Sequence, residues 1–381
     1  MPPPTKNVRK RIVAGVAATA AFGLVAACSS TTEPAVASAT KPIAKEDIVL
    51  VASVINTTNP YMASMIEGAK ALSTKLGVPL EIVDSQGSSQ TEISKIQAII
   101  AQGKKVVLMV NTVANSDVAP IVASVKQSGG FVTIWWNKPD NIEPAQEGDH
   151  FVAFQKHSGV ESGRCLAKKL AEGIGKKGNV LALAGVLDSN TSQTRVAGFQ
   201  DGLKAYPDVK LLDTQPANWD PQLGFKVTQS LIAKHGDKID GMWAADDAMI
   251  IGAIEAMKKA GRADQVKFVS DGLYPPVLEM MKTKANNNAV VGETFHRGYM
   301  AASIGLYTAY LAATGEIKPS ELPPEKRNSL FKISCVDETN LDELVKYDAD
   351  IPAWIDTLVE KGPWDTAPVE LVGAGPEKIP S

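Results

Sequence analysis

The sequence predicts an α/β fold with two similar lobes, each built on a doubly wound parallel sheet. From Glu46 onward, apolar runs of strand length alternate with amphipathic segments of helical length. Continuous apolar strands separated by helices are typical of a parallel sheet covered on both faces. The alternation restarts after a loop near residue 150, and 381 residues, 44% of them hydrophobic, suffice for two such domains.

The first series of elements precedes this loop. Strands are expected at 48–55, 80–84, 105–110 and 131–136, and helices at 61–76, 93–103 and 116–127. Gly103 suits the end of the second helix, because glycine readily adopts the left-handed conformation found at helix C-termini.

The second series follows the loop, and a shorter segment comes after it. Strands are expected at 150–155, 179–185, 209–215, 241–246, 266–272 and 289–295, and helices at 160–174, 194–206, 222–234, 247–260 and 276–282. A helix at 299–314, a strand at 329–336 and a helix at 351–360 are too few elements for a third domain. We expect them to return to the two lobes.

The N-terminus has the pattern of an export signal. Several basic residues precede an apolar run at 12–27, which is too short and too rich in small residues for a transmembrane helix and predicts a signal peptide at 1–27. The run ends in LVAACSS, which resembles a bacterial lipobox and implies acylation of Cys28; the alternative is a simple secretory signal. We expect an exported protein, lipid-anchored on the periplasmic side of the cytoplasmic membrane, with a flexible tether at 28–45.

Charge and cysteine content narrow the possible functions. The formal net charge of -3, with no basic run after the first residues, gives no electrostatic footprint for nucleic acid. The Cys and His spacing indicates no metal site, and no cofactor is expected. Cys165 and Cys335 can form a disulfide in an oxidising compartment or remain two buried thiols, and the sequence leaves both open.

Polar and aromatic residues gather where the expected strands end. Ligands of open parallel sheets bind beyond the carboxyl ends of the strands, which makes these residues candidate ligand contacts. They are Asn59, Tyr61, Met62, Asn111, Trp135, Trp136, Asn137, Arg195, Trp219, Asp246, Asp271, Glu293 and Thr294. Aromatic rings suit the C–H faces of a sugar or polyol, and amides and carboxylates hold its hydroxyls. A phosphate ligand would require several basic residues or a glycine-rich loop here.

The acids among these candidates raise the question of glycoside hydrolysis. Asp246, Asp271 and Glu293 follow or lie on separate strands, and recognition of hydroxyls explains isolated carboxylates equally well. Asp247 is expected to cap the next helix. No nucleophile elbow or ordered triad stands out, and Cys165 lies within a helix. We predict a binding protein and not an enzyme; the rival interpretations are a sensor lipoprotein coupled to a signalling receptor and a secreted carbohydrate-active enzyme.

Several segments together resemble a known family. In order, they are NPYM, VDSQGSSQTEISKIQAIIAQG, RVAGFQDGL, ANWD, DDAMIIGAIEAM and SDG. They look like the ribose-binding group of the periplasmic binding protein type I family, the sugar-binding components of bacterial ABC importers. The resemblance implies a monomer whose two lobes, joined by three hinge crossings, close on a monosaccharide or sugar alcohol and deliver it to importer permease subunits. It also implies discontinuous lobes, 46–154 with 295–332 and 155–294 with 333–381.

The same resemblance carries the family's sugar contacts onto matching positions. These are Asn59, Tyr61, Met62, Asn111, Arg195, Trp219 and Asp271. Met62 replaces an aromatic residue, and Asp246 stands where the family has asparagine. Glu293 or Thr294 falls near the family's glutamine. His296 flanks a crossing and is expected only to pack the hinge.

The largest departure from the family is the pair Trp135–Trp136, where the family often has Asp-Arg. The loss of two charged groups makes the pocket more aromatic. It predicts a sugar other than ribose or a linear sugar alcohol, with Asn137 as a replacement polar contact. Neighbouring strand residues point to opposite faces, so one indole is expected to face the ligand, with Trp136 favoured, while the other packs behind it.

Overall fold

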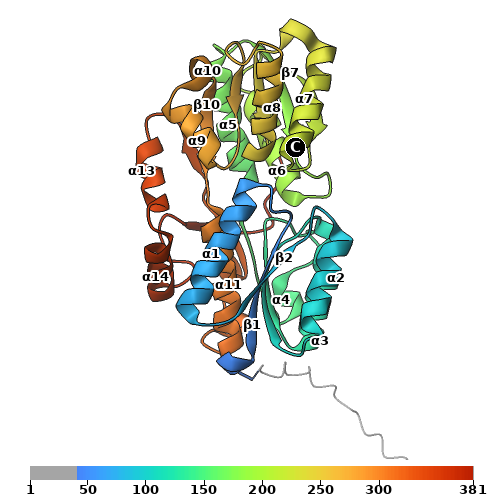
Figure 1. Cartoon of the computed structure of the whole chain (residues 1–381), viewed down its shortest axis with the longest axis vertical. Coiled ribbons are helices and arrows are strands. Elements are labelled where there is room, and N and C mark those ends of the chain that lie inside the picture. The colour runs from blue at the N-terminus through green and yellow to red at the C-terminus, as the bar shows by residue number, and fades with distance from the viewer. Residues whose placement is uncertain (1–40, 381) are drawn as a thin grey trace, which may run out of the picture. The chain divides into compact units, whose positions relative to one another are not determined.

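The structure, a computed structural model, describes residues 41–380. The predicted signal peptide, Cys28 and most of the predicted tether lie outside these residues. Within the described part, no helix is both long and apolar enough to cross a membrane. Figure 1 shows two sheets flanked by helices, one in the lower and one in the upper half of the view.

The sheet of the N-terminal lobe has seven strands in the order β13-β11-β5-β4-β3-β1-β2. They are β1 (Ile48–Val54), β2 (Leu80–Asp84), β3 (Lys105–Asn111), β4 (Phe131–Trp135), β5 (Phe151–His157), β11 (Asn328–Phe331) and β13 (Leu371–Ala374). The helices of this lobe are α1 (Pro60–Leu76), α2 (Ser89–Ile100), α3 (Val118–Ser128), α4 (Pro144–Glu147), α11 (Gly298–Thr314) and α12 (Pro324–Arg327). Alternate residues of β1 serve the two faces: Leu50 packs with α1 and α11, and Val51 packs with α2 and α3.

The sheet of the C-terminal lobe has six strands in the order β12-β10-β9-β8-β6-β7. They are β6 (Gly178–Ala184), β7 (Val209–Pro216), β8 (Gly241–Ala244), β9 (Lys267–Val269), β10 (Val290–Phe295) and β12 (Ser334–Val336). The helices are α5 (Gly159–Gly173), α6 (Asn190–Leu203), α7 (Pro221–His235), α8 (Asp247–Lys259), α9 (Pro275–Lys282) and α10 (Ala285–Asn288). Helices α5 and α6 approach so closely that a Cβ at Gly163 would lie 2.3 Å from the Arg195 carbonyl oxygen.

The chain passes between the lobes at the three expected places, which are β5 to α5, β10 to α11, and β11 to β12. It passes a fourth time after β12, because β13 pairs in the sheet of the N-terminal lobe. Within both sheets the strands are parallel, except that β12 and β13 run antiparallel to their neighbours. The predicted fold class, two doubly wound and mainly parallel sheets joined by hinge crossings, is therefore confirmed, with one passage more than the three expected. Cys165 of α5 and Cys335 of β12 form a disulfide with Cα atoms 5.9 Å apart, which answers the question that the sequence left open.

The segment after Val336 departs from the expected division into lobes. The sequence grouped 333–381 with the C-terminal lobe, but only β12 joins that sheet. After α13 (Leu341–Val345), helix α14 (Ile351–Lys361) packs on α1 and α11, and the Trp354 ring lies 5.5 Å from that of Tyr299. Strand β13 then pairs with β11 and covers a sheet edge. The pattern showed that α14 is amphipathic, but not which lobe its apolar side meets.

The last described residues return to the first crossing. The Glu377 carboxylate forms an ion pair with Lys156 Nζ at 3.0 Å, and both side chains are buried. It also accepts hydrogen bonds from the backbone N–H groups of Gly159, at 3.0 Å, and Val160, at 2.9 Å, where α5 begins. The C-terminal segment therefore contacts both lobes and the hinge between them.

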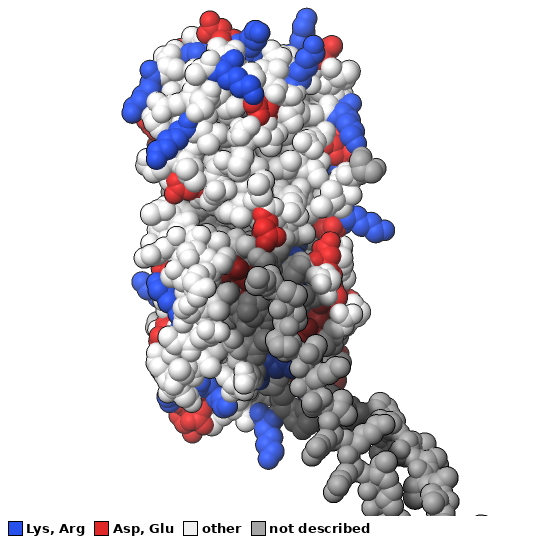
Figure 2. Space-filling view, turned by 90° about the vertical axis from the view of Figure 1, so that its right-hand side faces the viewer, with Lys and Arg blue, Asp and Glu red and all other residues white. Residues whose placement is uncertain are grey.

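Figure 2 shows the distribution of charge on one face of the molecule. Lys and Arg side chains are scattered, mainly toward the two ends of the view, and on this face the described residues form no continuous basic patch.

Candidate ligand-binding site

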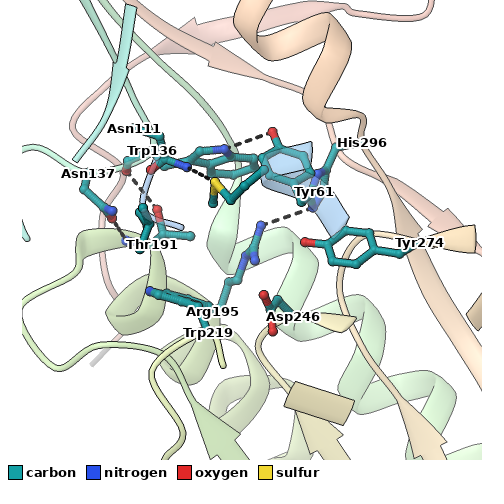
Figure 3. A pocket seen from close by; sticks show the side chains of 12 residues that line it. Tyr61, Asn111, Trp136, Asn137, Thr191, Arg195, Trp219, Asp246, Tyr274 and His296 are labelled. Atoms are coloured by element: carbon teal, nitrogen blue, oxygen red, sulfur yellow. Dashed lines mark hydrogen bonds between the residues drawn. The ribbon is translucent and has the colours of Figure 1, made fainter. Parts of the chain in front are cut away.

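A small pocket lies between the lobes, beyond the carboxyl ends of strands from both sheets (Figure 3). Its lining residues are Ile55, Tyr61, Met62, Asn111, Trp136, Asn137, Thr191, Arg195, Trp219, Asp246, Tyr274 and His296. The volume that the centre of a water molecule can reach is about 30 Å³. The pocket is thus compact, and it lies where ligands of open parallel sheets bind.

The two adjacent tryptophans have different places. Strand β4 ends at Trp135, and Trp136 follows with a φ of 69°, a left-handed conformation that bulky residues rarely adopt. Trp136 lines the pocket, and its Nε1 donates a hydrogen bond to the Tyr61 hydroxyl at 3.0 Å. Trp135 does not line it; fully buried, it stacks on Phe331 with ring centroids 5.7 Å apart. Of the pair, therefore, only Trp136 belongs to the pocket wall.

Asn111, the last residue of β3, provides a buried acceptor. Its Oδ1 has no hydrogen-bond partner, and its Nδ2 faces the sulfur of Met62 at 3.5 Å. Buried polar atoms in native proteins are normally paired, so an orphaned oxygen in a pocket wall is a natural site for a ligand donor.

Asn59 and Asn137 hold the two lobes together. Asn59 caps α1 and donates from Nδ2 to Asp246 Oδ2 of the other lobe at 2.8 Å, and it does not line the pocket. Asn137 does line it, but its Oδ1 accepts from Ser189 Oγ at 2.7 Å and its Nδ2 donates to the Thr112 carbonyl at 3.0 Å. Much of the hydrogen-bonding capacity of both amides is therefore used within the protein.

Trp219 supplies an aromatic face from the C-terminal lobe. It lies after β7 with a φ of 63° and is buried against Gly185. A Cβ at Gly185 would lie 2.0 Å from Cζ2 of the indole, so glycine at this position is what makes room for the ring. The ring Nε1 is buried without a partner and is available as a donor.

Arg195 of α6 brings a buried positive charge to the pocket. Its guanidinium lies 4.8 Å from the centre of the Trp136 ring, a cation–π distance. One terminal nitrogen donates to the Ala245 carbonyl at 2.6 Å, and the other pairs with Asp271 Oδ1 at 2.8 Å. The Nε atom has no partner. The group is thus fixed from behind while one donor stays free.

Asp271 lies behind Arg195 and does not line the pocket. Its Oδ1 also contacts His296 Nε2 at 2.5 Å, and its Oδ2 accepts a hydrogen bond from Ser162. Burial favours the neutral form, but the Arg195 charge and the His296 hydrogen bond outweigh it and hold the pKa of Asp271 at about 2. Because protein groups occupy both oxygens, this carboxylate orients Arg195 and does not face the pocket, contrary to the sequence expectation.

Asp246 is the acid that does line the pocket. Its Oδ1 accepts a hydrogen bond from Met249 N–H at 3.0 Å and caps α8. The sequence predicted Asp247 as this cap, and that prediction was wrong. Burial raises the pKa of Asp246 to about 7. This carboxyl therefore titrates near neutral pH inside the pocket.

Sequence reasoning missed four lining residues, Ile55, Thr191, Tyr274 and His296. His296 does more than pack the hinge: it lines the pocket directly after β10, with its ring 4.9 Å from that of Tyr61. Tyr274 stacks on Tyr61 from the other lobe at 6.0 Å, and Figure 3 shows its hydroxyl directed into the pocket. The position of His296 after a strand was a usable signal. Conversely, Glu293 and Thr294 are buried away from the pocket.

Comparison with known proteins identifies the class. A family model described as "Periplasmic binding protein domain" matches residues 49–315, and the chain belongs to this family of binding proteins, which are not enzymes. The ribose import binding protein RbsB of Salmonella typhimurium (strain LT2) is 30% identical over 233 residues, 60% of this chain and 74% of that protein. The xylitol-binding protein of Mycolicibacterium smegmatis is 26% identical over 257 residues, 68% of each chain.

A solved structure shows the same architecture. The twin-arginine translocation pathway signal protein from Burkholderia phytofirmans superimposes with a TM-score of 0.80 at 28% identity, covering 88% of this chain and 100% of that one. The fold is that of the type I periplasmic binding proteins, which capture solutes between two lobes.

Proposed function

We propose that this protein is an extracytoplasmic receptor that captures a monosaccharide or sugar alcohol and, as a monomer, delivers it to the permease of an ABC importer. The observation that most supports this function is the set of buried polar atoms without partners in the pocket wall. Asn111 Oδ1 can accept, and Trp219 Nε1 and Arg195 Nε can donate, among aromatic rings. A small solute with hydroxyls that both donate and accept, and with C–H faces, suits this combination.

The N-terminal lobe bears on the identity of the solute. Apart from His296 at the crossing after β10, its wall carries no acidic or basic side chain, and Trp135–Trp136 stands where the family often has Asp-Arg. Relatives include proteins named for ribose and for xylitol. We favour a small sugar other than ribose or a linear sugar alcohol, because the Trp136 indole of this wall offers a flat apolar face and its two amides offer uncharged polar contacts.

A ligand screen tests the proposal. The mature chain would be challenged with pentoses, hexoses and linear polyols in a thermal-shift assay, and hits would be measured by titration calorimetry. We expect a few related compounds to raise the unfolding midpoint with concentration, because a ligand that binds only the folded state stabilises it by mass action. The ligand should be recovered unchanged after long incubation. No response to any sugar or polyol, or conversion of the ligand, would contradict the proposal.

Anchoring through Cys28 requires its own test, since this residue lies outside the described part of the chain. We infer that the mature N-terminus carries a lipid on Cys28 at the outer face of the cytoplasmic membrane. Labelled fatty acid should be incorporated into the wild-type protein and not into Cys28→Ser, which should be found in the soluble extracytoplasmic fraction. Equal labelling of both proteins would rule out this anchor.

A further inference from the structure

Two buried acids lie behind the pocket without lining it. Asp247, the first residue of α8, and Glu293 of β10 are both 0% exposed. The Ser270 hydroxyl oxygen lies 2.6 Å from Asp247 Oδ1 and also 2.6 Å from Glu293 Oε1. The nearby groups Arg195 and His296 contact a different acid, Asp271.

The number of available protons limits the charge of this cluster. A serine hydroxyl carries one proton, so Ser270 can donate to only one of the two carboxyl oxygens. The other short contact needs a proton on the carboxyl itself, because two unprotonated oxygens at 2.6 Å would face each other with lone pairs. One of the two acids is therefore neutral and donates to Ser270.

The remaining carboxyl oxygens hold the turn that follows β9. Asp247 Oδ2 accepts a hydrogen bond from the backbone N–H of Tyr274 at 2.5 Å, and Glu293 Oε2 accepts one from Leu273 N–H at 3.3 Å. Leu273 has a φ of 54°, a left-handed conformation that a leucine adopts only where its surroundings support it. The turn at 270–274 is thus fixed to both α8 and β10.

This turn carries two groups of the ligand site. Its Asp271 fixes Arg195 through the ion pair at 2.8 Å, and its Tyr274 lines the pocket. We propose that Glu293 holds the shared proton and that Asp247, Ser270 and Glu293 form a carboxyl clamp that positions this turn for ligand binding. Glu293 and Asp247 are positioning residues. The part of this proposal that is tested by ligand affinity rests on the proposed function, and the protonation of Glu293 does not.

The surroundings of the clamp favour retention of the proton. Burial, and then the charge of Asp247, raise the pKa of Glu293 well above its ordinary value. Burial raises the pKa of Asp247 to about 6. The titratable groups around the clamp are Asp246 before α8, Asp271 and Tyr274 of the turn, Arg195 of α6, Lys169 of α5, and His296 and Arg297 after β10.

The cations among these groups are already paired. Arg195 pairs with Asp271, Arg297 with Asp348, and Lys169 with Asp337. A second negative charge in the clamp would therefore be buried next to the first with no cation dedicated to it, which is a costly arrangement.

Infrared spectroscopy tests the proton without any ligand. The full mature protein would be examined at about pH 9, where Asp246 and Glu92, each with a pKa of about 7, are mostly ionised. We expect the band of a buried protonated carboxyl group in the wild type and its loss in Glu293→Gln. Absence of the band, or its persistence in Glu293→Gln, would overturn the assignment of the proton to Glu293.

Ligand affinity tests the positioning role. Glutamine at 293 can donate to Ser270 and accept from Leu273, so Glu293→Gln should retain most of the affinity, whereas Glu293→Ala should lose roughly tenfold. Wild-type affinity should also fall at alkaline pH as the proton leaves, and Glu293→Gln should not show this fall. Equal losses in the glutamine and alanine variants, or the same alkaline fall in Glu293→Gln, would contradict the clamp.

A matched control comes from the other lobe. Glu92 is also fully buried and hydrogen-bonded by two serines, Ser53 and Ser85, but lies outside the pocket lining. Glu92→Gln should alter the pH dependence of stability and leave ligand affinity at alkaline pH like that of the wild type. If no sugar or polyol binds, the proposed function fails while the infrared result still decides the clamp.

Discussion

The two lobes build different walls around the same pocket. The N-terminal wall consists of Ile55, Tyr61, Met62, Asn111, Trp136 and Asn137, with His296 at the crossing after β10. None of these side chains is charged at neutral pH, because burial lowers the pKa of His296. The C-terminal wall holds Arg195 and Asp246, with Asp271 and the carboxyl clamp behind them. One wall presents aromatic rings and amide groups, and the other presents a guanidinium and a carboxyl group.

This difference shows how a two-lobed receptor can divide its tasks. Arg195 is held by Ala245 and Asp271 of its own lobe, and its guanidinium also meets Trp136 of the other lobe at 4.8 Å. Contacts between the lobes at the site include the hydrogen bond from Asn59 to Asp246 and the stacking of Tyr274 on Tyr61. We therefore expect changes in the C-terminal wall to cost most affinity, and changes in the N-terminal wall to alter selectivity.

The largest effect is expected for Arg195→Met. Hydrogen bonds to charged groups contribute about 1.5–3 kcal/mol, so ligand affinity measured by calorimetry should fall by roughly a hundredfold. Folding also needs to be checked by circular dichroism, because Asp271 loses its partner. The exposed Arg164, paired with Glu161 and Asp201, provides the control, and Arg164→Met should bind normally. Wild-type affinity in folded Arg195→Met would show that the Arg195 charge does not contribute to ligand binding.

A smaller loss is expected for the indole of the same wall. Trp219→Ala should weaken binding at least tenfold, or about 1.4 kcal/mol, because a stacking face and a free donor disappear. Trp243 of β8 is the matched control, buried in the same lobe and stacked on Phe199 at 4.6 Å. Trp243→Ala should cost about 3–5 kcal/mol of stability and little affinity. The reverse pattern would place the ligand elsewhere.

The tryptophan pair sharpens the comparison from the N-terminal wall. Trp136→Ala should lower affinity by roughly fivefold and change the ranking of sugars against linear polyols. Trp135→Ala should leave that ranking intact and reduce stability by about 3–5 kcal/mol, as expected for a buried core ring. Competition binding and urea unfolding separate the two effects. Loss of selectivity in Trp135→Ala would show that Trp135, and not Trp136, contacts the ligand.

The last prediction concerns the pH dependence of stability and not ligand affinity. Burial raises the pKa of Asp246 from 3.8 to about 7, so between these values the folded state holds a proton that the unfolded state has released. The contribution of this group to stability is complete below pH about 4 and is lost as pH rises to about 7. Asp246→Asn should remove this part of the decline in the free energy of unfolding with pH, as measured by urea unfolding. An unchanged decline would show that Asp246 is already ionised in the folded protein.

Several features of the site were visible in the sequence. Positions after strand ends identified Tyr61, Met62, Asn111, Trp136, Asn137, Arg195, Trp219 and Asp246, all of which line the pocket. The candidates Asn59, Trp135, Asp271, Glu293 and Thr294 do not line it. Strand ends can be located from apolar runs, but the direction of a side chain depends on local backbone angles, such as the φ of 69° at Trp136.

The sequence by itself determined that this is a two-lobed α/β protein with a polar and aromatic cleft, because buried parallel strands and covering helices leave strong periodic patterns. Only the tertiary structure decided that Asp271 supports Arg195, that Glu293 joins Asp247 behind the pocket, and that β13 returns to the N-terminal lobe. Such pairings depend on which distant segments meet. Local patterns record that a segment is apolar or charged, and not which partner it finds.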